Sequence, residues 1–468
     1  MKNFYKKISP GFFGLSLGWW ITIFLSTLAV ILWFFARPLE AIFSGNFISV
    51  MLNLGKVTGL VGMVLYALNL VYSTRLRFIE ELFGGLNRVY IAHHIVGGLA
   101  LVFLAFHPVF LSLQYITSSL RESAFMLIPH DLVPIKALFD TNNTLHFDVL
   151  QQWAIFFGII ALWGMVILLI ITFYIKLPYQ IWAFTHKFLG LAFFLGGLHV
   201  LFITSDTSNN NLLKFYILGI SLIGLGAFVY RTLMPKILIR RFKYRVANVY
   251  SPNPGIVKIG LNPINKIMPY KPGQFVFIRF LRTGIPELPA EWHPFSISSA
   301  PGDAMLEITT KSLGDYSSKL AKLNPNTMAE IEGAYGKFTY YNYDNFNQIW
   351  IAGGIGITPF ISMAKSLPAT GFSIDLYYSV KTESELVDWD SLAQIAKNAN
   401  GSFRLIPFIA DKQQGFLSVD FIRQYSGSFE NKEVFICGPP PMMKSLKNQF
   451  IKVGVKKSKI HSEEFAMS

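Results

Sequence analysis

The chain is 468 residues long, which is enough for two or three domains. Its one cysteine, Cys437, excludes an intrachain disulfide. The net charge of +14 does not indicate nucleic-acid binding, because many of the basic residues flank apolar segments, where the positive-inside rule for membrane proteins accounts for them.

Apolar residues are concentrated in the first half of the chain. Hydrophobic residues make up 52% of the total and the mean hydropathy is +0.42, but the second half alternates like a soluble α/β protein. The first apolar run is longer than the core of a signal peptide and lacks its small-residue cleavage site, so it is expected to span the membrane. Six runs predict spanning helices at about residues 12–35, 48–72, 90–114, 151–175, 181–204 and 213–234.

Basic residues predict the orientation of these helices. They gather in the N-terminus, the 73–90 loop, the 176–187 turn and the segment after the sixth helix, whereas the intervening loops have fewer. The positive-inside rule therefore places both termini in the cytoplasm.

Two of the expected helices carry histidines at nearly the same long spacing. His93 and His107 are fourteen residues apart, and His186 and His199 are thirteen apart. At 3.6 residues per turn both separations are close to four turns, or about 20 Å, so each helix presents both histidines on nearly one face. Neutral imidazoles that face each other across a helical bundle are suitable axial ligands for haem iron. The pattern predicts two haems stacked across a membrane.

A structural explanation of these histidines competes with the haem hypothesis. A single histidine in an apolar helix is more often a hydrogen-bonded core residue. Ionisable residues in spanning helices are nevertheless rare and tend to be functional, and the repeated spacing favours haem. His94 has no counterpart in the second helix, where Lys187 follows His186, so we interpret His94 as a neighbour of the ligand.

The second half predicts two further domains. Short β-type runs from about Lys236 predict a small antiparallel barrel or sandwich. After about residue 346, strands and helices alternate, which is typical of a parallel sheet with helices on both faces and ligands at the carboxyl ends of its strands. The expected domains are residues 1–235, 236–345 and 346–468.

Two motifs in the barrel region suit a flavin nucleotide. The first combines an aromatic face with a hydroxyl, which can stack on a flat heterocycle and hydrogen-bond to it. The second offers a cation and then a helix start, whose free N–H groups suit a pyrophosphate. Taken alone, the first is also compatible with a buried strand and the second with an ordinary capped helix. Their residues are His293, Pro294, Phe295 and Ser296, and Thr310, Lys311, Gly314, Asp315, Tyr316 and Ser317.

Two motifs in the last region suit a dinucleotide. The first follows a strand and opens a helix, with Thr358 expected as the N-cap, although it lacks the commonest glycine spacing. The second is a strand end with a rigid turn, in which a lone cysteine is more often structural than reactive. The order and placement of all four motifs favour the functional interpretation. The residues are Gly353, Gly354, Gly356, Ile357, Thr358 and Pro359, and Cys437, Gly438 and Pro439.

From about residue 50 to the end, the sequence resembles the NADPH oxidase and ferric reductase superfamily, in a form like its prokaryotic members. The first half is similar to the ferric reductase-like transmembrane domain with two bis-histidine haems, and the second to ferredoxin-NADP reductase. The resemblance implies that HPFS contacts the FAD ring, that the Lys311–Ser317 segment contacts its pyrophosphate, and that GGIGITP and CGPPP bind the nicotinamide nucleotide. The sequence departs from the family pattern at two places. Ala334 stands where the family has proline. Phe465, the aromatic expected to cover the flavin, is followed by three more residues instead of ending the chain.

The expected protein is a membrane flavohaem oxidoreductase of a bacterial plasma membrane. It would pass electrons from cytoplasmic NADPH through FAD and two b-type haems to an external small-molecule acceptor. Oxygen, giving superoxide, is the favoured acceptor; a ferric-chelate reductase and a membrane subunit that serves a partner enzyme are the alternatives. NADH is the alternative donor.

Four residues are expected to act in catalysis: Ser296, Cys437, Phe465 and Lys56. Cys437 is expected beside the nicotinamide. Lys56 lies about 12 Å into the second helix, where the family's oxidases carry an arginine. It is expected to stabilise developing superoxide or hold a haem propionate, or else to snorkel to the surface. Leu111 stands where those oxidases carry a histidine, which keeps ferric chelates as a competitor. Ser379 and Lys381 follow a strand where they could meet a 2′-phosphate.

Overall fold

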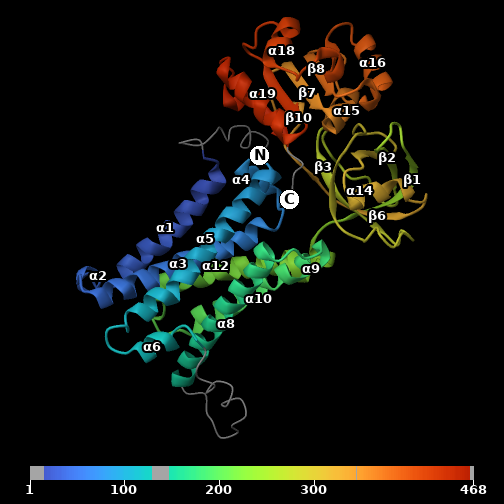
Figure 1. Cartoon of the computed structure of the whole chain (residues 1–468). Helices are drawn as coiled ribbons and strands as arrows, with labels where there is room; N and C mark the ends of the chain where they lie inside the picture. Colours follow the sequence, from blue (N-terminus) through green and yellow to red (C-terminus); the bar gives the residue numbers. More distant parts are fainter. Residues whose placement is uncertain (1–14, 129–146, 344, 464–468) are drawn as a thin grey trace. The chain divides into compact units, whose positions relative to one another are not determined.

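The computed structural model describes residues 15–128, 147–343 and 345–463. Phe465 and the basic N-terminal segment lie outside this part of the chain. The chain forms two compact units that divide between Ile239 and Arg240, a helical unit followed by an α/β unit (Figure 1).

Among its described residues, the helical unit has six helices long and apolar enough to cross a membrane. This confirms the prediction of a six-helix membrane domain. Short helices join them: α2 (Leu39–Phe43), α4 (Arg77–Phe83), α6 (Leu120–Phe125), α11 (Asp206–Asn209) and α13 (Pro235–Leu238). The spanning elements are α1 (Leu17–Ala36), α3 (Phe47–Tyr72), α5 (Leu86–Leu113), α8 (Phe147–Tyr174), α9 (Tyr179–Lys187) with α10 (Leu189–Phe202), and α12 (Asn211–Phe228), which continues as a π-helical turn over Val229–Leu233.

The fifth span differs from the single uninterrupted helix expected over residues 181–204. It is interrupted at Phe188, where tighter turns appear: the N–H of Phe188 donates to Thr185 O at 3.0 Å, and Phe188 O accepts from the N–H of Leu191 as well as from that of Ala192, both at 3.0 Å. Just beyond the break, Gly190 lies against the ring of Phe228, and an added Cβ would come within 2.0 Å of it. His186 therefore belongs to α9 and His199 to α10.

The α/β unit begins with an antiparallel barrel of six strands. The strand order is β4-β3-β6-β1-β2-β5, and a bridge between Ile297 and Ile308 connects the two end strands. The predicted antiparallel barrel is confirmed. The strands are β1 (Phe242–Tyr250), β2 (Ile256–Pro263), β3 (Phe275–Leu281), β4 (His293–Ser296), β5 (Leu306–Lys311) and β6 (Met328–Tyr335).

The second part of this unit is a five-stranded sheet in which every pair is parallel. Its order is β11-β10-β7-β8-β9, and buried side chains cover both faces, with α15 and α16 on one and α18 and α19 on the other. The predicted parallel sheet is confirmed. Its elements are β7 (Asn347–Gly353), α15 (Thr358–Lys365), β8 (Ser373–Val380), α16 (Trp389–Asn398), β9 (Phe403–Ile409), α18 (Val419–Ser426), β10 (Glu433–Cys437), α19 (Pro440–Lys452) and β11 (Ile460–Glu463).

Candidate functional site

The four histidines expected to bind haem form two facing pairs. The ring centres of His93 and His186 are 6.3 Å apart, and so are those of His107 and His199. Two imidazoles that each place a nitrogen about 2 Å from one metal ion have ring centres roughly 6 Å apart. Both pairs therefore have the separation at which one metal ion could bind a nitrogen of each ring.

Backbone carbonyls fix three of the four rings. In each case the carbonyl accepts a hydrogen bond from Nδ1, which sets the tautomer and leaves Nε2 available as a ligand. The bonds run from His93 to Asn69 O at 3.1 Å, from His107 to Gly55 O at 2.7 Å and from His199 to Ala154 O at 2.7 Å.

Two glycines make room for the rings of the 107–199 pair. An added Cβ at Gly59 would lie 2.6 Å from Nδ1 of His107, and one at Gly158 would lie 2.7 Å from Nδ1 of His199. Sequence reasoning missed both residues. The available signal was a small-residue spacing on a spanning helix, Gly55 and Gly59, which is typical of close helix packing.

The donor set fits haem better than a bare metal ion. Within the described ranges, no group of three or more His, Cys, Asp and Glu side chains is placed to hold a metal. A porphyrin would supply four nitrogens itself, so the two histidines of one pair would be enough to complete the binding of its iron.

Lys56 forms an ion pair with Asp206, which was not among the site residues expected from the sequence. Its ammonium lies 2.8 Å from Oδ1 of Asp206, in α11. Asp206 also accepts a hydrogen bond from Trp33 Nε1 at 2.9 Å and pairs with Arg37 at 3.2 Å. Burial alone would raise the pKa of Asp206, but Lys56, Trp33 and Arg37 together lower it. The Lys56 side chain is 20% exposed, so it packs with this group instead of extending freely to the surface.

The two flavin motifs meet in the barrel. His293, at the start of β4, stacks on Tyr316 of α14 (Asp315–Lys319) with ring centres 3.6 Å apart. Burial lowers the pKa of His293, although the nearby Glu291 carboxylate opposes this shift. Phe295 and Ser296 follow in the same strand and are each 7% exposed.

The expected pyrophosphate site is partly occupied by the chain itself. The N–H groups of Leu313 and Gly314, just before α14, donate to Oγ of Ser317 at 3.0 and 3.1 Å. The ammonium of Lys311 lies 3.5 Å from Oε1 of Glu385. A pyrophosphate bound here would replace Glu385 as the partner of Lys311.

The two nucleotide motifs pack backbone to backbone at the carboxyl ends of β7 and β10. An added Cβ at Gly356 would lie 2.4 Å from Cys437 O, and one at Gly438 would lie 3.0 Å from Gly353 Cα. The chain leaves β7 towards β8 and returns on the other side as β10, so this is the switch point where open α/β sheets bind ligands. The expected N-cap was wrong: Thr358 is already helical, and its hydroxyl donates to Ile355 O because a tight turn over Gly354–Ile357 precedes the helix.

Cys437 is fully buried at the end of β10. Burial, and then the charge of Glu463, raises the pKa of its thiol well above the usual value. A thiol so buried is a small packing side chain, unlike the exposed thiols that react as nucleophiles.

Ser379 pairs in register with Gly353, so it lies at the same sheet edge as the glycine turn. Lys381 follows, and its backbone N–H donates to Oε2 of Glu385 at 3.0 Å. Burial alone would raise the pKa of Glu385, but this bond and the charge of Lys311 lower it.

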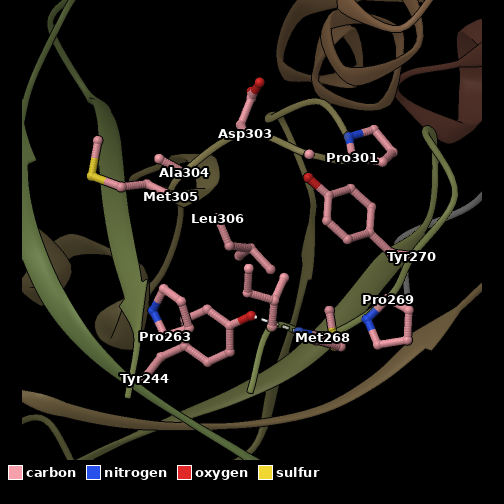
Figure 2. Close-up of a pocket in the computed structure, with 12 residues that line it drawn as sticks. Tyr244, Pro263, Met268, Pro269, Tyr270, Pro301, Asp303, Ala304, Met305 and Leu306 are labelled. Atoms are coloured by element: carbon pink, nitrogen blue, oxygen red, sulfur yellow. Dashed lines mark hydrogen bonds between the residues drawn. The ribbon is translucent and has the colours of Figure 1, made fainter. Parts of the chain in front are cut away.

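A separate cavity of about 260 Å³ lies near the start of β5 (Figure 2). Lys311, of the expected pyrophosphate site, lies at the other end of that strand. Prolines, methionines and two tyrosines line it, and the hydroxyl of Tyr244 accepts the N–H of Met268 there. None of the sequence-predicted site residues lines this cavity.

Three family models match successive parts of the chain. A ferric reductase-like transmembrane component matches residues 58–197, an FAD-binding domain residues 241–348 and an oxidoreductase NAD-binding domain residues 350–448. The chain matches the NADPH oxidase and ferric reductase superfamily through these three domains taken together, none of which covers half of it. It is a multi-pass membrane oxidoreductase with FAD-binding and NAD(P)H-binding domains, and it carries out NAD(P)H-driven transmembrane electron transfer.

Curated relatives cover about half of the chain. NADH-cytochrome b5 reductase 1 of Kluyveromyces lactis is 24% identical over 241 residues, which are 49% of this chain and 85% of that protein. The ferredoxin reductase component of the 3-ketosteroid-9-alpha-monooxygenase of Rhodococcus rhodochrous is 28% identical over 203 residues, 42% of this chain and 56% of that protein.

Solved structures are similar over a comparable share. The cytochrome b5 reductase domain of Ulva prolifera nitrate reductase has a TM-score of 0.43 and 19% identity, covering 48% of this chain and 97% of that one. The ferredoxin NADP+ reductase of Neisseria gonorrhoeae with bound FAD and NADP has a TM-score of 0.41 and 20% identity, covering 48% and 98%.

Proposed function

We propose that this protein transfers electrons from cytoplasmic NADPH, through FAD and two bis-histidine b-type haems, to oxygen outside a bacterial plasma membrane, and forms superoxide. The observation that carries the proposal is the pair of equal ring separations, 6.3 Å for His93 with His186 and 6.3 Å for His107 with His199. The proposed division is residues 1–235 for the haems, 236–345 for FAD and 346–468 for the nucleotide, with both termini cytoplasmic.

Each bound group supplies chemistry that side chains lack. A hydride carries two electrons and haem iron accepts one, so FAD is the group that converts between them. The histidines of each pair would hold a haem iron between them, and the Nδ1 bonds of His93, His107 and His199 keep their rings in an orientation suited to that role. Because both histidines of a pair would bind the iron, an acceptor would have to react without binding the metal.

The residues of the α/β unit bind and orient the two nucleotides. Phe295 and Ser296 support the flavin ring, and Lys311 neutralises the pyrophosphate. The Gly353–Pro359 turn admits the dinucleotide backbone at the switch point, and Cys437, small and neutral, lies beside the nicotinamide. Ser379 and Lys381 meet the 2′-phosphate, which favours NADPH over NADH.

The charges around Asp206 support an acceptor whose product is an anion. Lys56 and Arg37 share one carboxylate, so the group has an excess of one positive charge. A cation in a low-dielectric site stabilises negative charge that develops in the reaction. Ferric-chelate reduction is the second candidate, because Leu111 stands where the family's oxidases carry a histidine. The Leu111 side chain packs against Gly55.

A third candidate is a membrane subunit that feeds a partner enzyme. The nucleotide-binding domain argues against it, since a subunit that only relays electrons between partners needs no nucleotide site of its own.

Absorbance spectroscopy of the purified protein tests the proposal. Addition of NADPH to FAD-loaded protein should produce the spectrum of reduced b-type haem, and intact protein without that signal would refute the redox function. Alanine variants of the four histidines should each lose haem. Superoxide formation by intact wild type supports the oxidase, whereas ferric-chelate reduction without superoxide would assign the second candidate.

A further inference from the structure

His186 is held differently from the other three histidines. The Nδ1 atoms of the others each bond to a backbone carbonyl. Nδ1 of His186 is buried, and no described group of the chain accepts a hydrogen bond from it. The His186 ring can therefore turn without breaking such a bond.

The carbonyls of α3 explain why the histidines of α5 are both bonded. Gly55 and Asn69 accept these bonds and are fourteen residues apart, the same spacing as His93 and His107. Two helices with matching spacings of about four turns can make both contacts at once.

Helix α8 lies beside the two helices that carry His186 and His199, as α3 does beside the helix of His93 and His107, but its described carbonyls accept a hydrogen bond from only one of the two rings. Ala154 accepts the bond of His199, but fourteen residues further on the carbonyl of Leu168 accepts the hydroxyl of Thr172 at 2.7 Å. The break at Phe188 also places His186 in a different helix from His199.

An indole takes the place of the missing hydrogen bond. Trp182 lies one turn before His186 in α9, and its ring stacks on the imidazole with centres 5.2 Å apart and planes at 19°. Stacking restrains the plane of the ring through dispersion and π contacts but does not polarise the N–H as a carbonyl does.

We propose that Trp182 is a positioning residue for His186, and that His186 is the axial ligand most easily displaced among the four. This inference rests on the haem assignment proposed above. A hydrogen bond from the outer nitrogen of a ligating imidazole fixes its orientation and strengthens it as a donor, and His186 alone has an indole face in place of that bond. The two haem sites thus differ in ligand strength although their ring separations are equal.

Carbon monoxide tests this inference because it binds reduced haem only where an axial position opens. In the dithionite-reduced holoprotein, Trp182→Leu should retain haem and bind carbon monoxide at one of its two haems. Trp182→Phe, which keeps a stacking ring, should behave like wild type. Trp163→Leu is the matched control, since Trp163 lies in the same unit, is 46% exposed and donates to Leu127 O.

The outcomes separate this inference from the proposed function. Wild type without haem would overturn the haem assignment itself. Two haems in Trp182→Leu with carbon monoxide binding no greater than in wild type would overturn the role of Trp182. If that variant does not accumulate, warming the reduced wild type in steps decides: one haem should bind carbon monoxide before the other, and simultaneous reaction of both would overturn the inference.

Discussion

The ammonium of Lys56 lies 2.8 Å from the carboxylate of Asp206, 150 residues further along the chain. Lys56 directly follows Gly55, whose carbonyl accepts the Nδ1 hydrogen bond of His107. Two neighbouring residues of α3 therefore have distinct contacts. Gly55 binds the proposed haem ligand His107, and Lys56 is oriented by Asp206, which precedes α12.

Replacing Lys56 tests the role of this cation. Lys56→Met should slow NADPH-driven superoxide formation by about tenfold or more, the effect of losing one charged partner of a developing anion. Haem content and reduction of the 93–186 haem should remain as in wild type. Unchanged superoxide formation would leave Lys56 a structural partner of Asp206 only.

Replacing Asp206 separates the charge of Lys56 from its position. Asp206→Asn keeps a group that can accept from Trp33 but removes the ion pairs to Lys56 and Arg37. Superoxide formation should fall while haem content is retained, because the ion pair with Asp206 no longer fixes the position of the Lys56 ammonium. Exposed Asp420 provides the matched control, Asp420→Asn, which should have no effect.

The glycines beside the 107–199 pair should not tolerate a methyl group. Gly158→Ala would place a Cβ 2.7 Å from Nδ1 of His199 and should displace that ring, so that one of two haems is lost or bound weakly. Gly164→Ala in the same helix is the control, because an added Cβ there meets nothing within 4 Å. Haem stoichiometry decides, and full haem content in Gly158→Ala would contradict the placement of His199.

A methyl group at the nucleotide switch point should affect the donor side only. Gly356→Ala would bring a Cβ to 2.4 Å from Cys437 O, forcing apart the two turns that bind the dinucleotide. We expect a raised KM for NADPH and slower flavin reduction, with haem content unchanged. Gly415→Ala, whose nearest atom is Gln413 O at 3.9 Å, is the control. Equal kinetics in the two variants would argue against a nucleotide site here.

Lys381 should determine part of the preference for NADPH. A charge-assisted bond contributes about 1.5–3 kcal/mol, so Lys381→Ala should lower kcat/KM for NADPH by roughly tenfold or more and change that for NADH little. The carboxylate of Glu385 is within bonding distance of the Lys381 N–H and would oppose a 2′-phosphate. Equal specificity constants for both nucleotides in wild type and variant would remove this role.

Local pattern was sufficient for most of the architecture. Long apolar runs identified the six spans, because a bilayer requires about 20 apolar residues per helix. Alternating strands and helices identified the parallel sheet, and the helical period placed His93 and His107 on one face of one helix. The same argument for His186 and His199 assumed one unbroken helix, whereas the structure divides them between α9 and α10.

Tertiary structure decided what depends on how distant segments approach each other. Asp206 gave no sign in the sequence that it would hold Lys56, and nothing local indicated that Gly158 or Gly356 would face a ring or a carbonyl. The break at Phe188, and with it the unbonded Nδ1 of His186, depends on contacts between helices. Sequence periodicity reports which face of an element is apolar, whereas the partner of a polar group is set by the register of two elements against each other.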